Sequence, residues 1–227
     1  MLMPLTTDQL SLLRITNTPT IANAMEKLGI RDRAEGFTRG NVRAIYPDLG
    51  VMVGYAVTVT MRSMQAPAKK LALKSYWDHI ATIPSPRVVV VQDLDERPLG
   101  ALWGEVNANI HRALGCIGVL TNGTVRDVDD VQPLGFHFFA SGVAVSHVWA
   151  YPEGFDKPVT VDGMAVRPGD LIHADKHGAI TIPIEHVDAL LNAVTAVERY
   201  ERPLIQLSKS PEFSTAKLEQ LMKNPVV

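Results

Sequence analysis

Apolar residues recur at helical spacing near both ends of the chain. A capping-box pattern beginning at Thr6 precedes the first apolar stretch, and the pair Thr18-Pro19 is typical of a second helix start. Near the C-terminus a longer apolar stripe precedes Pro203, which is expected to end its helix because proline lacks the backbone N–H. Terminal helices are therefore expected from Thr6, from Thr18 to Gly29, over 184–200 and over 214–222.

Between these ends, short apolar runs alternate with stretches of helical spacing. Gly115 closes one such helix, and the pair Asn122-Gly123 forms a tight turn. Strand–helix–strand alternation at this spacing indicates a parallel sheet with crossover helices. The expected strands cover 51–61, 87–92 and 117–121, and the expected helices cover 66–80 and 103–114.

After residue 136 the pattern changes to short strands joined by turn residues. Asp162-Gly163 suits a hairpin, and Gly169 and Gly178 suit two further tight turns. The chain has no repeat or linker, so the sequence predicts one α/β domain over 1–227, a parallel βαβ unit followed by short hairpin strands. These strands are expected over 136–140, 144–149, 159–161, 164–166, 171–174 and 179–182.

The composition is that of an ordinary soluble globular protein, with 46% hydrophobic and 20% charged residues among 227. A formal net charge of −2 argues against nucleic-acid binding, which needs a dense basic patch. The N-terminal sequence MLMPLTTDQL lacks the pattern of a signal peptide, and no apolar run approaches the ~20 residues of a membrane span. With Cys116 as its single cysteine, we expect a cytoplasmic enzyme or binding protein with no membrane association.

Several common catalytic patterns are absent from the sequence, among them the Gly-rich dinucleotide and phosphate loops and the serine nucleophile elbow. Cys116 lies in an apolar stretch and is expected to be a packed residue rather than a nucleophile. His173 and His177 are four residues apart, but a turn is expected between them, which disfavours a zinc site.

The stretch 99–131 carries the strongest indication of chemistry. It places a helix start at 104–107 ahead of a strand that leads to Arg126 and Asp127. In a parallel sheet, strand ends and the starts of the following helices face one crevice. Free N–H groups at the helix start can hold a carboxylate, and Arg126 can clamp the same anion. Asp127 can be an oxygen ligand for Mg²⁺ or Mn²⁺.

A purely structural interpretation fits the same residues. Asp127 can be the N-cap of a short helix through Asp130, and Arg126 can be a surface partner of Asp129 or Asp130. Asp129 and Asp130 themselves fit first-turn helix carboxylates better than metal ligands. The spacing alone does not distinguish the capping interpretation of Asp127 from the metal-binding interpretation.

The segment GEV…GCIGVLTNGTVRD resembles the signature of the 4-hydroxy-4-methyl-2-oxoglutarate (HMG) aldolase family, which also contains the RraA regulators of ribonuclease E. TPTIANAMEKLG, AVTVTM and PGDLIHADKHGAITIP resemble its N-terminal helix, first long strand and closing hairpin. Asn23 and the turn at 175–178 depart from the family pattern. The resemblance covers about 16–200, with 201–227 as a helical extension. It implies a three-layer β/β/α fold of the RraA-like swivelling-domain type, assembled as a homotrimer or a dimer of trimers with sites between subunits.

The resemblance also implies roles for individual residues. Asp127 would coordinate a divalent metal, Mg²⁺ or Mn²⁺, and Arg126 would hold the pyruvyl group of the substrate. Glu105 stands where the family has an acidic residue near the metal-bound waters, and it is our candidate for the catalytic base. The backbone amides that bind substrate would belong to Gly104, Glu105, Val106 and Asn107.

We therefore expect a metal-dependent class II aldolase that cleaves a small 4-hydroxy-2-oxo acid, such as HMG, to pyruvate through an enolate. Decarboxylation of oxaloacetate passes through the same enolate and is expected as a second activity. The alternative is a non-catalytic RraA-like protein that binds and regulates a ribonuclease. A Schiff-base aldolase would need a desolvated lysine, whereas lysines such as Lys74 and Lys176 lie in polar settings.

Overall fold

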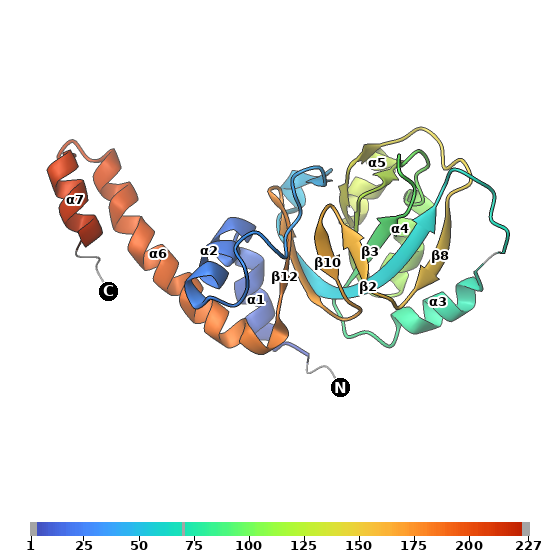
Figure 1. Cartoon of the computed structure of the whole chain (residues 1–227), viewed down its shortest axis with the longest axis horizontal. Helices are drawn as coiled ribbons and strands as arrows, with labels where there is room; N and C mark the ends of the chain where they lie inside the picture. Colours follow the sequence, from blue (N-terminus) through green and yellow to red (C-terminus); the bar gives the residue numbers. More distant parts are fainter. Residues whose placement is uncertain (1–3, 70, 224–227) are drawn as a thin grey trace.

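The structure is a computed structural model that describes residues 4–69 and 71–223 (Figure 1). Short 3₁₀ helices cover Pro47–Leu49, Gln132–Leu134 and Ile184–His186. None of the helices in the described ranges combines the length and apolar character that crossing a membrane requires. The α-helices are α1 (Thr7–Ile15), α2 (Thr18–Leu28), α3 (Leu73–Ile80), α4 (Glu105–Ala113), α5 (Val128–Val131), α6 (Val187–Lys209) and α7 (Thr215–Lys223).

The main sheet has the strand order β1-β6-β4-β3-β2-β11-β12. Strands β2, β3, β4 and β6 run parallel, as the alternating pattern predicted, with α3, α4 and α5 in the connections between them. The carboxyl ends of β2, β3 and β4 therefore meet at one edge of the sheet. The strands are β1 (Arg43–Ala44), β2 (Met52–Arg62), β3 (Arg87–Asp93), β4 (Cys116–Thr121), β5 (Thr124–Val125), β6 (His137–Ala140), β7 (Gly142–Val143), β8 (Tyr151–Phe155), β9 (Val159–Val161), β10 (Met164–Val166), β11 (Leu171–Asp175) and β12 (Gly178–Ile182).

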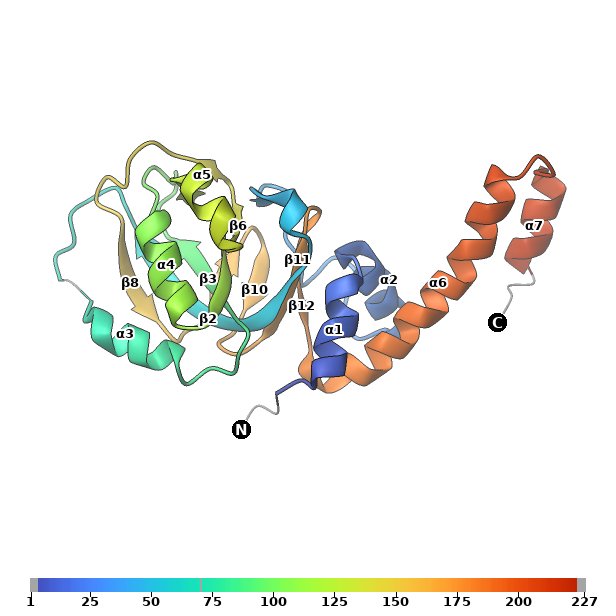
Figure 2. The same ribbon diagram turned by 180° about the vertical axis from the view of Figure 1, so that it is seen from behind.

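Each face of the main sheet is covered by a second layer (Figures 1 and 2). On one face, the β9–β10 hairpin shares an apolar core with β3, in which Val161 and Met164 lie with Val88 and Val90. On the other face, helices close a larger core that includes Leu13 of α1 and residues of α3, α4, α5 and α6. Hairpin, sheet and helices form the three-layer β/β/α arrangement that the family resemblance implied.

The N-terminal helices begin and end close to the predicted positions. Both hydrogen bonds of the capping box at Thr6 are present, and Gly29 ends α2 in the left-handed region with φ 63°. The N-cap of α2 is Asn17 rather than Thr18, because Asn17 Oδ1 accepts the N–H of Thr20 at 2.9 Å. The Thr18 hydroxyl is engaged elsewhere, at 3.0 Å from Nδ1 of His173.

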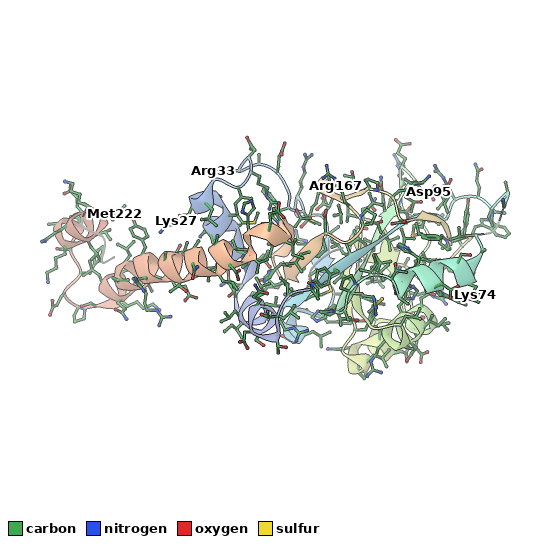
Figure 3. The ribbon with its side chains drawn as sticks, turned by 90° about the horizontal axis from the view of Figure 1, so that it is seen from below. Lys27, Arg33, Lys74, Asp95, Arg167 and Met222 are labelled. Carbon is green, nitrogen blue, oxygen red and sulfur yellow. The ribbon has the colours of Figure 1, made fainter. Side chains whose placement is uncertain are left out.

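Helix α6 contradicts the expectation that Pro203 ends the C-terminal helix, because it continues through Pro203 to Lys209. Its first half packs on α1 and α2, and no residue of α6 after Val197 is buried. The second half projects away from the sheet, and α7 folds back beside it (Figures 1 and 3). Contact with α7 supports this part of α6 beyond the proline, which removes one helical hydrogen bond. We call residues 198–223 the C-terminal arm.

The helix expected over 66–80 forms only in its second half, from Leu73. Residues 66–69 and 71–72 are not helical, and residue 70 lies outside the described residues. Pro67 accounts for part of the difference, since a proline disfavours the helical conformation of the residue before it.

The strand expected over 144–149 is an irregular loop. The Ser146 hydroxyl accepts the N–H of Val148 at 3.0 Å, and the N–H of Ala150 donates to the carbonyl of His147 at 2.7 Å. These local bonds compete with strand pairing and hold Val148 at a positive φ of 46°. The unpredicted strand β8 follows directly and pairs antiparallel with β2.

Candidate functional site

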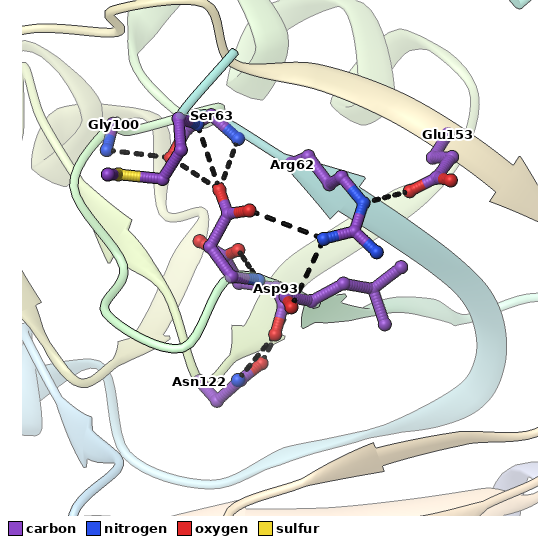
Figure 4. Close-up of polar contacts among 9 residues, drawn as sticks. Arg62, Ser63, Asp93, Gly100, Asn122 and Glu153 are labelled. Atoms are coloured by element: carbon purple, nitrogen blue, oxygen red, sulfur yellow. Dashed lines mark hydrogen bonds and ion pairs between the residues drawn. The ribbon is translucent and has the colours of Figure 1, made fainter.

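A strand-end cluster of polar residues joins the carboxyl ends of β2, β3 and β4: Arg62, Ser63, Asp93, Asp95 and Asn122 (Figure 4). Asp95 accepts the N–H of Ser63 at 2.6 Å and lies 3.4 Å from Nη1 of Arg62. Asn122 makes two hydrogen bonds to the backbone of Asp93, accepting from its N–H at 2.8 Å and donating to its carbonyl at 2.9 Å. These side-chain contacts therefore add to the sheet pairing, which reaches Met61 with Asp93 and Val91 with Thr121, in fixing the three strand ends.

The two carboxylates of this cluster have opposite electrostatic environments. Burial raises the pKa of Asp93 to about 6, and its Oδ2 atom has no hydrogen-bond partner among the described residues. Burial also acts on Asp95, but hydrogen bonds from the backbone of Ser63 and Met64 outweigh it and lower the pKa of Asp95. The cluster thus holds one carboxylate whose charge is stabilised by hydrogen bonds and one whose charge is destabilised by burial.

The loop between β3 and α4 is anchored to this cluster and runs from it toward Arg126. The Ser63 hydroxyl accepts the N–H of Gly100 at 3.1 Å. Further along, the N–H of Arg126 donates to the carbonyl of the buried Trp103 at 2.9 Å. These contacts bring Gly104, the residue before α4, beside Asp127.

Asp127 caps the start of α4 from 22 residues away in the sequence. Its Oδ2 atom accepts the backbone N–H of Glu105 at 3.0 Å. Gly104 occupies the N-cap position of α4 without a side chain of its own, and a Cβ atom there would lie 2.2 Å from the same oxygen. Glycine at position 104 therefore lets a carboxylate approach a helix N-terminus, where the helix dipole favours negative charge.

Asp127 occupies the N-cap position of α5, as the capping interpretation expected, but its side chain makes no capping hydrogen bond to that helix. Its backbone is left-handed, with φ 54° and ψ 42°, a conformation that Asp and Asn adopt more readily than other non-glycine residues. The side chain contacts α4 instead.

Arg126 pairs with Asp127 rather than with Asp129 or Asp130. Among the described residues its one ion pair joins Nε to Oδ2 of Asp127 at 3.6 Å, and the two side chains are 36% and 33% exposed. Asp129 and Asp130 are exposed in the first turn of α5. A guanidinium and a carboxylate thus lie together where a small molecule can reach both.

Around this pair lies a pocket of about 170 Å³. Gly104, Val106 and Asn107 line it together with Arg126 and Asp127, so the structure gathers five of the six predicted site residues. The remaining residues of its wall are Ala101, Leu102, His147 and Ala150.

Glu105, the sixth predicted residue, is exposed and does not line this pocket. Its side chain forms no hydrogen bond with the described part of the chain, whereas its backbone N–H is the donor to Asp127. The helix-start amides without a partner among the described residues are those of Val106 and Asn107.

His147 is a pocket residue that the sequence pattern does not predict. This residue lies in the loop that was expected to be a strand, 20 positions after Asp127, and no spacing rule connects the two. A turn with Val148 in the left-handed region brings His147 to the pocket, with its Nδ1 atom 2.8 Å from the carbonyl of Val148.

The residues of this pocket fit a Mg²⁺ or Mn²⁺ ion better than a zinc ion. The Oδ1 atom of Asp127 makes no hydrogen bond with any described residue, and the carboxylate of Glu105 belongs to the first residue of α4, just outside the pocket wall. Within 4–69 and 71–223 no three His, Cys, Asp or Glu side chains gather as a metal cluster would require. Mg²⁺ commonly takes one or two carboxylates and keeps several waters, whereas zinc needs three or four protein ligands.

Cys116 and His173 have structural roles. Cys116 is 2% exposed in the main core, and burial raises the pKa of its thiol to about 12. Both ring nitrogens of His173 contact protein groups, Nδ1 with Thr18 Oγ1 and Nε2 with the carbonyl of Leu13, each at 3.0 Å. Neither side chain is available as a nucleophile or a metal ligand.

Comparison with known proteins places this geometry in a family. Protein DlpA of Legionella pneumophila is 22% identical over 206 residues, which cover 90% of this chain and 31% of DlpA. A Halalkalibacterium halodurans protein named "Putative 4-hydroxy-4-methyl-2-oxoglutarate aldolase" is 30% identical over 100 residues, 44% of this chain and 48% of that protein. The chain thus spans half or less of the length of these two relatives.

A solved structure shares the fold. The crystal structure of Streptomyces coelicolor RraAS2, described as an unusual member of the RNase ES inhibitor RraA protein family, has a TM-score of 0.71 at 23% identity. The match covers 89% of this chain and 98% of RraAS2. Residues 18–181 match the profile of the RraA-like family, described as Aldolase/RraA. These residues include the parallel strands β2, β3 and β4 as well as Arg126 and Asp127. The chain therefore belongs to the RraA-like family.

Proposed function

We propose that this protein is a divalent-metal-dependent lyase that cleaves a 4-hydroxy-2-oxo acid to release pyruvate. The observation that carries the proposal is the accessible pair of Arg126 and Asp127 at the start of α4, in a pocket that also presents the amides of Val106 and Asn107. A guanidinium and helix-start amides are suited to a carboxylate, and a free carboxylate oxygen is suited to a hard cation.

In the proposed reaction the C3–C4 bond breaks and its electron pair stays on C3, which gives the enolate of pyruvate. The C4 hydroxyl loses its proton, C4 becomes a carbonyl, and C3 is then protonated. Arg126 binds the substrate carboxylate through its planar pair of N–H donors and stabilises the developing negative charge. When bound, a divalent cation would supply Lewis-acid polarisation of the keto oxygen.

Asp127 and Glu105 have different parts in this proposal. Asp127 is the residue that would hold Mg²⁺ or Mn²⁺ through its Oδ1 atom while Oδ2 accepts the Glu105 amide. Glu105 is the proposed base for the C4 hydroxyl, directly or through a water, because its carboxylate begins the helix that Asp127 caps. Oxaloacetate decarboxylation would use the same groups, since it leaves the same enolate.

The test is release of pyruvate from HMG and from oxaloacetate by the purified chain, with Mg²⁺ or Mn²⁺ and after treatment with EDTA. We expect turnover with metal, loss with EDTA, and recovery when excess metal is added. Full turnover in EDTA would contradict the metal-dependent reaction, and no turnover of any hydroxy-oxo acid with metal would contradict the lyase itself.

The second candidate function is that of a non-catalytic regulator that binds a ribonuclease. It rests on the structural match to RraAS2, whose description names RNase ES inhibition. A regulator has no need for an accessible guanidinium, a free carboxylate oxygen and unpaired helix-start amides in one pocket, so the site favours the lyase. We further propose a cytoplasmic homotrimer or dimer of trimers.

A further inference from the structure

A second cavity, of about 570 Å³, adjoins the pocket of Arg126 and Asp127. Leu102, Asn107, His147 and Ala150 belong to the walls of both, so the two cavities lie directly side by side. A cavity of this size is within the range that holds organic ligands, roughly 300–1,000 Å³. The polar pocket alone is smaller than that range.

Aromatic and aliphatic side chains dominate the walls of this second cavity. All three tryptophans of the chain contribute, namely Trp77, Trp103 and Trp149, and Tyr76 lies with them. Val59 of β2 and Val91 of β3 form its floor on the sheet side. We call it the aromatic cavity.

No Lys, Arg, Asp or Glu is among the described residues that line the aromatic cavity. Of its two histidines, His111 is buried, and burial lowers its pKa to about 4, so its ring is neutral at pH 7. The Nε2 atom of His111 lies 2.9 Å from the Tyr76 hydroxyl, and its Nδ1 atom lies 2.7 Å from the carbonyl of Asn107. Among the described residues that line either cavity, Arg126 in the adjoining pocket is therefore the only Lys or Arg.

From this distribution we infer that the substrate is a 4-hydroxy-2-oxo monocarboxylate with an aryl or branched alkyl group at C4. The inference rests on the proposed function. The carboxylate would lie at Arg126, and the C4 group would fill the aromatic cavity. A second carboxylate, as in HMG, would meet apolar walls whose described residues offer no Lys or Arg to pair with, and burying an unpaired charge is strongly unfavourable.

The phenyl compound illustrates the reaction. In 4-hydroxy-2-oxo-4-phenylbutanoate the C3–C4 bond breaks, the C4 hydroxyl proton leaves as the carbonyl forms, and C3 gains a proton. The products are pyruvate and benzaldehyde, and no oxidant or further reactant is needed.

Kinetics with the full chain and Mg²⁺ test the inference directly. We expect kcat/KM for 4-hydroxy-2-oxo-4-phenylbutanoate to exceed that for HMG by about 100-fold or more, since even one methylene in an apolar pocket gives about 10-fold. Cleavage of HMG at an equal or higher kcat/KM would overturn the inference and leave the proposed lyase function intact.

Binding provides a readout that does not depend on turnover. The compound 2-oxo-4-phenylbutanoate lacks the C4 hydroxyl and cannot be cleaved, and all three tryptophans should report its arrival by fluorescence. We expect it to bind at least about tenfold more tightly than 2-oxoglutarate, which carries a carboxylate in place of the ring. Equal or weaker binding would overturn the inference, whether or not any substrate is cleaved.

A pair of variants tests the location. Leu73 of α3 lines the aromatic cavity and is 44% exposed, so Leu73→Arg adds a cation there without burying it. Ser75→Arg adds the same charge to the same helix at an exposed position outside the cavity wall. We expect Leu73→Arg to reduce the preference for the phenyl compound at least tenfold and Ser75→Arg to leave it unchanged. An unchanged preference in both variants would contradict the placement of the C4 group.

Discussion

The carboxylate of Asp127 and the backbone N–H of Glu105 are joined by a 3.0 Å hydrogen bond. One carboxylate oxygen thereby completes the N-terminus of α4, and the other makes no hydrogen bond with the described residues. One oxygen of Asp127 thus has a structural role, and the other is free to bind a metal ion. Suitable substitutions at position 127 can test the two roles separately.

Asp127→Asn keeps an oxygen that can accept the Glu105 N–H but removes the negative charge, whereas Asp127→Ala removes both. We expect both variants to lose binding of Mn²⁺, measured by calorimetry, and to lose pyruvate release. Thermal unfolding should distinguish them, because Asp127→Ala loses the cap and about 1 kcal/mol of stability and Asp127→Asn loses little. Retention of Mn²⁺ binding by Asp127→Asn would contradict the metal-binding role.

Arg126→Lys retains the positive charge but loses the planar two-pronged donor. We expect Mn²⁺ affinity to change little while kcat/KM falls by about 10²–10³, the usual cost of removing one donor from a site of developing negative charge. Steady-state kinetics and calorimetry on the same preparation check this. A variant with undiminished kcat/KM would show that the charge alone suffices.

Gly104→Ala would place a Cβ atom 2.2 Å from Oδ2 of Asp127. Because the two atoms cannot share that space, we expect the Asp127–Glu105 bond to break, with a loss of about 1–3 kcal/mol in stability and of most activity. Gly142→Ala is the matched control, since a Cβ atom at Gly142 meets nothing within 4 Å. Similar activity in the two variants would mean that the close approach at Gly104 is not required.

The pKa of Asp93 is raised to about 6, above its unfolded value, so the folded state holds the proton more tightly. Protonated Asp93 therefore makes its full contribution to the free energy of unfolding below about pH 4, and this contribution is lost as the pH rises to about 6. Asp93→Asn does not titrate, so its free energy of unfolding, relative to the parent protein, should rise by about 1–3 kcal/mol between pH 4 and pH 7. Urea unfolding at both pH values gives this difference, and a difference that does not change with pH would contradict the raised pKa.

Three apolar residues of the C-terminal arm have exposed fractions between 45% and 54%, namely Ile205, Phe213 and Met222. We expect these side chains to be covered by another copy of the chain, because a helix as short as α7, with 9 residues, is rarely stable without packing. Sedimentation should show an oligomer at micromolar concentration, and Ile205→Glu with Phe213→Glu should weaken it. Thr195→Glu, an exposed change in the first half of α6, serves as control. A monomeric parent protein would contradict this expectation.

Hydrophobic patterning predicted the order of elements well, because strands β2 to β4 are nearly continuous buried runs and helix α2 has one buried face. It failed where local hydrogen bonds decide the conformation, as in the loop with Ser146 and His147. It placed Arg126 and Asp127 in one region but could not predict that Asp127 caps α4, since that contact depends on a left-handed residue and a glycine 23 positions earlier. The aromatic cavity joins α3, β2, β3 and the loop before β8, and no sequence pattern links these segments.

The left-handed backbone at Asp127 also bears on how members of this family can diverge. Besides glycine, Asn and Asp are the residues that adopt this conformation at least cost, and a single nucleotide change separates their codons. A lineage can therefore exchange carboxylate for amide at this position while the cap on α4 and the surrounding fold persist. Loss of catalysis would then precede any loss of structure, and a folded chain without turnover would be left for selection to use as a binding protein.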